Sequence, residues 1–118
     1  MMVKTILLAE DGKETQAVVR RILEGEGFAV EAVADGKEAV NALALGTFHA
    51  AILDLGLPEV SGLEVLRHVR AEGMGLPVIV MSGRQDHALE AVGEGAQGYL
   101  LKPFTFEALQ EQIERCVR

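Results

Sequence analysis

An apolar run that ends in an aspartate, near the middle of the chain, constrains the fold more than any other stretch. Residues 50–53 read Ala-Ala-Ile-Leu, Asp54 follows them directly, and the next eight residues contain two glycines and a proline. A continuous apolar run between turn signals is typical of a strand that is buried on both faces. Residues 6–11, which read Ile-Leu-Leu-Ala-Glu-Asp, repeat this pattern. Strands of this kind occur in parallel sheets covered by helices, so the two stretches predict an α/β fold.

The composition predicts one domain with a hydrophobic core of its own. The chain has 118 residues, 49% of them hydrophobic, and a core of that size forms without disulfides or a structural metal. The formal net charge of −7 argues against direct contact with nucleic acid. The apolar runs are far shorter than the roughly 20 residues that span a bilayer, and the single cysteine, Cys116, forms no internal disulfide. We therefore expect a cytoplasmic protein that contacts neither membranes nor nucleic acid directly.

Segments with the pattern of strands alternate with segments of helical spacing. We expect strands near residues 3–9, 28–33, 49–54, 78–81 and 98–101, with helices near 13–24, 35–46, 63–73, 86–95 and 106–117. Helical spacing assigns several apolar residues to the buried faces of these helices, among them Val18, Leu45, Leu89, Val92 and Phe106. Right-handed crossovers between such units give a parallel sheet with helices on both faces. The predicted fold is a single doubly wound (βα)5 domain over residues 1–118, of flavodoxin-like topology, with strand order 2-1-3-4-5.

Polar residues follow four of the expected strands at the point where each strand ends. In this strand order the first and third strands are neighbours, which places Glu10, Asp11 and Asp54 at one rim of the sheet. Carboxylates so close together repel one another unless a cation joins them, and an all-oxygen ligand set suits Mg²⁺. A carboxylate there can attack phosphorus to form an acyl phosphate. Ser82 and Lys102 end the fourth and fifth strands at the same rim, where a hydroxyl and an ammonium can bind phosphoryl oxygens.

Over essentially its whole length the chain resembles the response-regulator receiver domain of two-component signalling. The resemblance is carried by Leu8-Ala9-Glu10-Asp11, Ile52-Leu53-Asp54 with Pro58 and Gly62, Val80-Met81-Ser82-Gly83, and Gly98-Tyr99-Leu100-Leu101-Lys102-Pro103-Phe104. It implies a receiver domain, without an output domain in this chain, that takes a phosphoryl group from a phosphohistidine of a sensor histidine kinase or a phosphotransfer protein. Such a domain is a signalling module that catalyses only its own Mg²⁺-dependent phosphorylation and dephosphorylation.

The resemblance also implies which residues bind the phosphoryl group and the metal. Asp54 is the implied phosphorylation site. Asp11 and Asp54 hold Mg²⁺ directly, with the backbone carbonyl of Gly56, and Glu10 acts mainly through water. Position 56 usually carries a side chain such as Met or Asn in this family. We therefore expect the phosphoryl group to be more open to water here, with an effect on the lifetime of the phosphorylated form.

Four further residues acquire roles through the same resemblance. Ser82 follows the phosphoryl group, Lys102 contacts it, and Tyr99 changes between outward and inward rotamers. The bond between Lys102 and Pro103 is expected to be cis, a conformer that X–Pro bonds allow at low cost. Together these changes are expected to remodel the surface of the fourth helix, fifth strand and fifth helix for an unidentified downstream protein.

Other functions on this topology are weaker fits. A flavin-binding electron carrier needs an anion-binding loop after the first strand, where this chain has Glu10 and Asp11. A phosphohydrolase with an aspartyl nucleophile usually carries a second acid at the place of Gly56. The remaining alternative is a pseudo-receiver, an unphosphorylated protein-binding module, against which the complete set of acidic residues argues.

Overall fold

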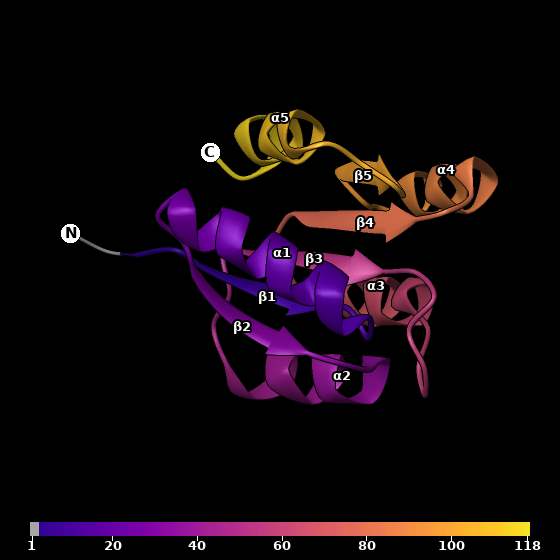
Figure 1. Ribbon diagram of the computed structural model, residues 1–118. Helices are drawn as coiled ribbons and strands as arrows, with labels where there is room; N and C mark the ends of the chain where they lie inside the picture. Colours follow the sequence, from indigo (N-terminus) through magenta and orange to yellow (C-terminus); the bar gives the residue numbers. More distant parts are fainter. Residues whose placement is uncertain (1–2) are drawn as a thin grey trace.

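Five short strands form one parallel sheet in the computed structural model, which describes residues 3–118. The strands are β1 (Thr5–Ala9), β2 (Ala29–Val33), β3 (Ala50–Asp54), β4 (Val78–Ser82) and β5 (Gly98–Leu101). Their order is β2-β1-β3-β4-β5, and all four neighbouring pairs are parallel (Figure 1). Every residue of β3 and β4 is buried, as the continuous apolar runs predicted. The expected fold class and strand order are therefore confirmed.

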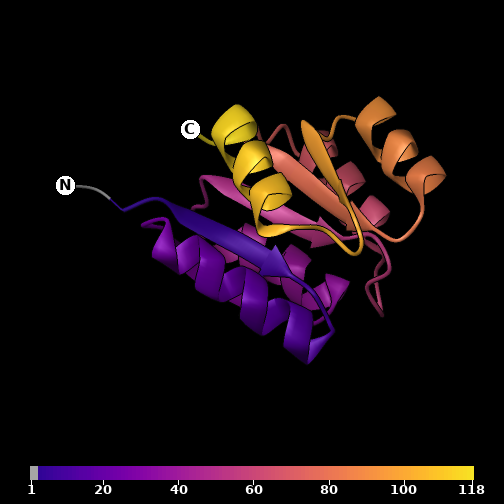
Figure 2. The same cartoon turned by 45° about the horizontal axis from the view of Figure 1, so that its top comes forward.

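Five helices cover the two faces of this sheet. They are α1 (Lys13–Gly25), α2 (Gly36–Leu45), α3 (Gly62–Ala71), α4 (Gln85–Gly93) and α5 (Phe106–Cys116). In Figure 2, α1 and α5 lie in front of the sheet, and α2 and α3 lie behind it. Ile6 and Leu8 of β1 pack in the core under α1 and α5, whereas Leu7 and Ala9 pack under α2, α3 and α4. The alternation of side chains along each strand thus divides the core into two layers.

Local sequence sets where most of the helices begin. The side chains of Asp35, Ser61 and Thr105 accept hydrogen bonds from backbone N–H groups in the first turns of α2, α3 and α5. The N-cap of α4 is Arg84, whose side chain makes no such bond. The start of α4 therefore lacks the local stabilisation that these other three helices have.

Several of the core positions predicted on the helices are wrong. Five apolar side chains that spacing assigned to the core are exposed, by 57, 90, 51, 39 and 41% respectively: Val18, Leu45, Leu89, Val92 and Phe106. Val19 of α1 and the small residues Ala88 and Ala91 of α4 are buried instead. Alanines allow α4 to lie close to the sheet, and this close packing turns the larger apolar residues outward.

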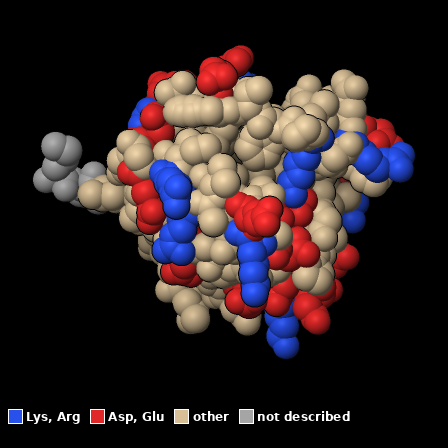
Figure 3. Space-filling model, in the orientation of Figure 1, with Lys and Arg blue, Asp and Glu red and all other residues tan. Residues whose placement is uncertain are grey.

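The surface carries charges of both signs. Acidic and basic side chains are interspersed on the face seen in Figure 3, so the net charge of −7 does not come from one block on that face. The longest helix, α1, has 13 residues, and no helix in residues 3–118 is long and apolar enough to cross a membrane.

Candidate functional site

The ends of β1 and β3 place three carboxylates side by side. Because Ala9 pairs with Leu53, the residues that follow β1 lie next to Asp54. One oxygen each of Glu10, Asp11 and Asp54 lies within 4.8 Å of the others. The side chains differ in exposure, since Glu10 is 2% and Asp54 8% exposed, whereas Asp11 is open to solvent. The cluster is therefore buried on one side and accessible on the side of Asp11.

An ammonium group from the opposite end of the chain lies against these carboxylates. Lys102 Nζ is 2.6 Å from Glu10 Oε1 and 3.3 Å from Asp54 Oδ2. The backbone N–H of Lys102 donates to the carbonyl of Ser82 at 2.8 Å, which holds this residue in line with β4. Burial opposes the charge of Lys102, but the hydrogen bond that Lys102 donates to Glu10 and the charge of Asp54 outweigh it and raise the pKa of Lys102. The ammonium therefore stays charged beside the two carboxylates.

Backbone N–H groups occupy the other oxygens of the two buried carboxylates. Gly12 N donates to Glu10 Oε2 at 3.0 Å, and Gly56 N donates to Asp54 Oδ1 at 3.2 Å. Both oxygens of Glu10 thus have donors within the protein. This arrangement favours contact between Glu10 and a cation through water, while the exposed Asp11 is free of that constraint.

The loop after β3 folds back over the backbone of Asp54. Leu55 N donates to Met81 O at 2.9 Å, and Gly62 N donates to Leu55 O at 3.2 Å. A Cβ at position 62 would overlap the carbonyl oxygen of Asp54, so only glycine fits this close approach. A Cβ at Gly56 would meet nothing within 4 Å except Asp54 Oδ1 at 3.9 Å. The position beside Asp54 Oδ1 that a side chain of residue 56 would take is consequently unfilled.

Ser82 and Tyr99 lie on the neighbouring strands. Ser82 is buried, and its Oγ accepts a hydrogen bond of 3.0 Å from Arg84 N at the start of α4. Tyr99 of β5 is half-buried and packs against the core layer that includes α4. The peptide bond between Lys102 and Pro103 is cis. A direct hydrogen bond therefore links Ser82, at the rim of the sheet, to the start of α4.

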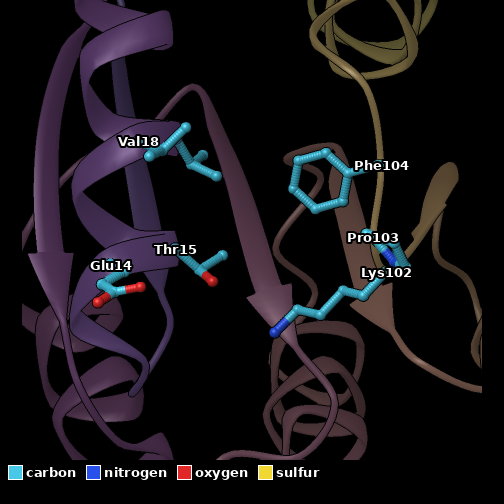
Figure 4. A pocket seen from close by; sticks show the side chains of 7 residues that line it. Glu14, Thr15, Val18, Lys102, Pro103 and Phe104 are labelled. Atoms are coloured by element: carbon cyan, nitrogen blue, oxygen red, sulfur yellow. The ribbon is translucent and has the colours of Figure 1, made fainter.

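A groove of about 500 Å³ lies beside Lys102, and sequence reasoning did not find it. Its lining comes from α1 and from the segment after β5: Glu14, Thr15, Val18, Val19, Lys102, Pro103 and Phe104. In Figure 4, Val18 and Phe104 face one another across the groove, and Lys102 reaches past its end. Helical spacing assigned Val18 to the core, so the sequence pattern did not predict this exposed groove.

The comparison with a protein family decides what this site belongs to. Residues 6–114 match the model of the response regulator receiver domain. The chain belongs to this family. It is 41% identical to the response regulator protein PmrA of Pseudomonas aeruginosa over 115 residues, which are 96% of this chain and 52% of the relative. It is 36% identical to the transcriptional regulatory protein TctD of Salmonella typhimurium, with 96% of this chain and 51% of the relative covered. The receiver domain described here spans about half the length of these relatives.

Solved structures show the same fold. The receiver domain of a sensor histidine kinase from Pseudomonas aeruginosa, which has magnesium coordinated in its active-site cleft, matches with a TM-score of 0.87 and 31% identity over 98% of both chains. The chemotaxis protein CheY4 of Vibrio cholerae matches with a TM-score of 0.88 and 27% identity, over 98% of this chain and 99% of that one. Both are similar to this receiver domain across nearly its whole length.

The acidic cluster fits the magnesium site of the receiver family. Glu10, Asp11 and Asp54 offer only oxygen ligands, and their atoms lie close enough together to share one ion. Oxygen ligands at a partly open rim suit a small hard cation that keeps part of its water shell.

Proposed function

We propose that this receiver domain accepts a phosphoryl group on Asp54 from a phosphohistidine of a sensor histidine kinase or a phosphotransfer protein. The observation that carries the proposal is the setting of the Asp54 carboxylate. Gly56 N donates to one of its oxygens and Lys102 Nζ lies 3.3 Å from the other, beside the unfilled position that a side chain of residue 56 would take. This orients a carboxylate toward an incoming phosphorus atom.

Asp11, Asp54 and the backbone carbonyl of Gly56 are the residues that would hold Mg²⁺, with Glu10 acting through water. When bound, the ion neutralises charge on the transferring phosphoryl group. The donor set fits this role because the carboxylate oxygens lie within 4.8 Å of one another and Asp11 leaves the cluster open to solvent on one side.

The chain's own groups perform the transfer. An oxygen of Asp54 forms a bond to phosphorus as the N–P bond of the phosphohistidine breaks, and the electron pair of that bond returns to the imidazole nitrogen. Lys102 Nζ already lies 3.3 Å from Asp54 Oδ2, so its ammonium is close to the position that the phosphoryl oxygens take. Ser82 supplies a hydroxyl donor from the neighbouring strand. These two groups stabilise the charge on the transferred oxygens.

The same step explains how the signal leaves the site. When Ser82 turns toward the new phosphoryl group, its Oγ gives up the hydrogen bond from Arg84 N, and the space beside it admits the ring of Tyr99. The surface of α4, β5 and α5 then changes for a downstream protein. That surface exposes four large apolar side chains in the present state: Leu89, Val92, Leu101 and Phe106.

The groove between α1 and Phe104 is the surface that a protein donor would use. It ends at Lys102, so a helix seated there would bring its histidine beside Asp54. Val18, which lines this groove and is exposed, supplies an apolar contact there.

Incubation with acetyl phosphate and Mg²⁺, followed by intact-mass measurement, tests the proposal. We expect the parent chain to gain one phosphoryl group and Asp54→Asn to gain none. Asp35→Asn is the matched control, since asparagine also caps a helix and Asp35 is not one of the three clustered carboxylates. A parent chain that takes no label from acetyl phosphate or from a phosphohistidine donor would be an unphosphorylated protein-binding module instead.

A further inference from the structure

Helix α4 has little apolar contact with the sheet. Of its residues only Ala88 and Ala91 are buried, while Leu89 and Val92 are 51 and 39% exposed. Two alanines bury little apolar surface, and the free energy of burial scales with that surface. The position of α4 therefore depends on the polar contacts at its two ends.

The C-terminal end of α4 is held by two arginines of α3. Arg67 Nε and Nη2 donate to the two carboxylate oxygens of Glu94, each at 2.7 Å. One turn further along α3, Arg70 Nε and Nη2 donate to the carbonyl of Gly95 at 3.1 and 2.8 Å. A planar guanidinium with two parallel bonds fixes direction as well as distance.

Arg70 also joins this end of α4 to the strands. Its Nη1 donates to the carbonyls of Met74 and Leu76 at 2.9 and 3.1 Å, in the segment before β4. Its Nη2 donates to Gln97 Oε1 at 2.8 Å, and the same oxygen accepts from Val78 N at 2.7 Å. One side chain thus ties together the ends of α3 and α4 and the starts of β4 and β5.

The backbone after α4 is shaped for this contact. Gly95 has a φ of 110°, a conformation that other residues rarely adopt. A Cβ at this position would lie 3.0 Å from Arg70 Nε and 3.3 Å from Arg70 Cδ. Glycine is therefore required twice here, by the turn and by the close approach of the arginine.

The N-terminal end of α4 is held differently. Its N-cap residue, Arg84, makes no capping bond with its side chain. The backbone N–H of Arg84 donates to Ser82 Oγ at 3.0 Å, and the ion pair of Arg84 with Asp86 stays within this exposed end of the helix. The hydrogen bond from Arg84 N to Ser82 Oγ thus ties the start of α4 to the sheet through a hydroxyl, the group that moves in the proposed function.

We propose that Arg67 and Arg70 form a pivot at the C-terminal end of α4, about which the helix swings when Ser82 releases Arg84. Residues near the start of α4 then move furthest, and Glu94 and Gly95 stay in place. The pivot itself is a property of the unphosphorylated chain. Only its triggering by phosphorylation rests on the proposed function.

Amide hydrogen exchange on the unphosphorylated chain, read residue by residue by NMR, tests the pivot. In Ser82→Ala we expect faster exchange at Arg84 and Ala88, with Gly95 and Ala96 unchanged. In Arg67→Gln and in Arg70→Lys we expect unchanged exchange at Arg84 and Ala88. Exchange at Gly95 and Ala96 is expected to be about tenfold faster. Both of these amides are hydrogen-bonded within the end of α4 in the parent chain.

Three comparisons make the test specific. Arg20→Gln removes an exposed arginine that pairs with Glu24 on α1 and is expected to leave α4 unchanged. Arg67→Lys keeps a charge beside Glu94 and is expected to restore part of the protection. Arg70→Lys also keeps its charge, but one ammonium cannot donate to all the separate carbonyls that the guanidinium joins. This variant is therefore not expected to restore the protection of Gly95 and Ala96.

Addition of Mg²⁺ and beryllium fluoride then tests the trigger. In the parent chain we expect altered exchange at the start of α4 alone, and in Arg67→Gln we expect the change to extend to Gly95. Equal release of both ends in Ser82→Ala, or full protection of Gly95 and Ala96 in the arginine variants, would overturn the pivot. No response to beryllium fluoride would count against the proposed function, while the Ser82 and arginine variants still decide the pivot.

Discussion

Lys102 Nζ lies 2.6 Å from Glu10 Oε1 and joins the end of β5 to the end of β1 across 92 positions of the chain. The same nitrogen is 3.3 Å from Asp54 Oδ2. One ammonium thus lies between two buried carboxylates that would otherwise repel each other. This contact joins the ends of β1, β3 and β5 at one rim of the sheet and also supplies the charge that the proposed transfer uses.

Removal of this ammonium is expected to destabilise the fold. In Lys102→Gln the buried carboxylate of Glu10 loses its charged partner, and we expect the free energy of unfolding to fall by about 2 kcal/mol. Urea denaturation measures this change. Lys37→Gln, at an exposed position of α2, is the control and is expected to stay within about 0.5 kcal/mol of the parent. Equal stability of the two variants would show that the contact contributes nothing.

A side chain at position 56 is expected to prolong the phosphorylated state. A Cβ at Gly56 would lie 3.9 Å from Asp54 Oδ1 and meet nothing else within 4 Å, so an asparagine there has room to cover this carboxylate and shield it from water. We expect Gly56→Asn to lose its phosphoryl group several-fold more slowly than the parent, as measured by intact mass after removal of the donor. Gly75→Asn, at a position where a Cβ meets nothing within 4 Å, controls for the substitution itself. An unchanged rate in Gly56→Asn would mean that access of water does not limit the lifetime.

A negative charge in the groove beside Lys102 is expected to slow phosphorylation by a protein donor but not by acetyl phosphate. Val18→Asp places a carboxylate at an apolar contact surface, so we expect phosphoryl transfer from a phosphohistidine protein to slow by about tenfold. Labelling by acetyl phosphate needs no docking surface and is expected to be unchanged. The matched control is Leu45→Asp, a substitution on α2 at a leucine that is 90% exposed. A normal rate with the protein donor would place docking elsewhere.

The ion pair between Arg67 and Glu94 is expected to depend on pH. The hydrogen bond from Arg67 lowers the pKa of Glu94, although burial opposes this. A carboxyl with a lowered pKa stabilises the fold above its unfolded value, ordinarily 4.5, and this contribution is lost as pH falls through the folded value. We therefore expect Arg67→Gln to be less stable than the parent at neutral pH and the difference to vanish in acid.

An NMR titration of the Glu94 carboxyl checks this sign. Its pKa is expected to rise toward the ordinary value in Arg67→Gln. Glu64 and Glu90 also lie near Arg67 and raise its pKa, so Glu90→Gln serves as the control for a general change of charge. A Glu94 pKa that is the same in the parent and in Arg67→Gln would exclude the ion pair in solution.

The sheet and the cluster of acids followed from local patterns. An apolar run that stops at a polar residue marks both a buried strand and its end, and this information lies within a few neighbouring residues. The strand order then brings Glu10, Asp11 and Asp54 to one rim, because parallel strands end at the same edge of a sheet. The groove at Val18 and the arginines of α3 did not follow, since neither depends on a motif.

The sequence by itself thus determined the order of strands and helices and the residues that end each strand, because periodicity and apolar continuity act over short distances. Tertiary structure alone decided which face of each helix is buried. In α4 either the alanines or the larger Leu89 and Val92 satisfy helical spacing, and the close approach of the helix to the sheet selects Ala88 and Ala91. It also decided that the two ends of α4 are held by different groups, because those contacts join segments that are remote in the chain.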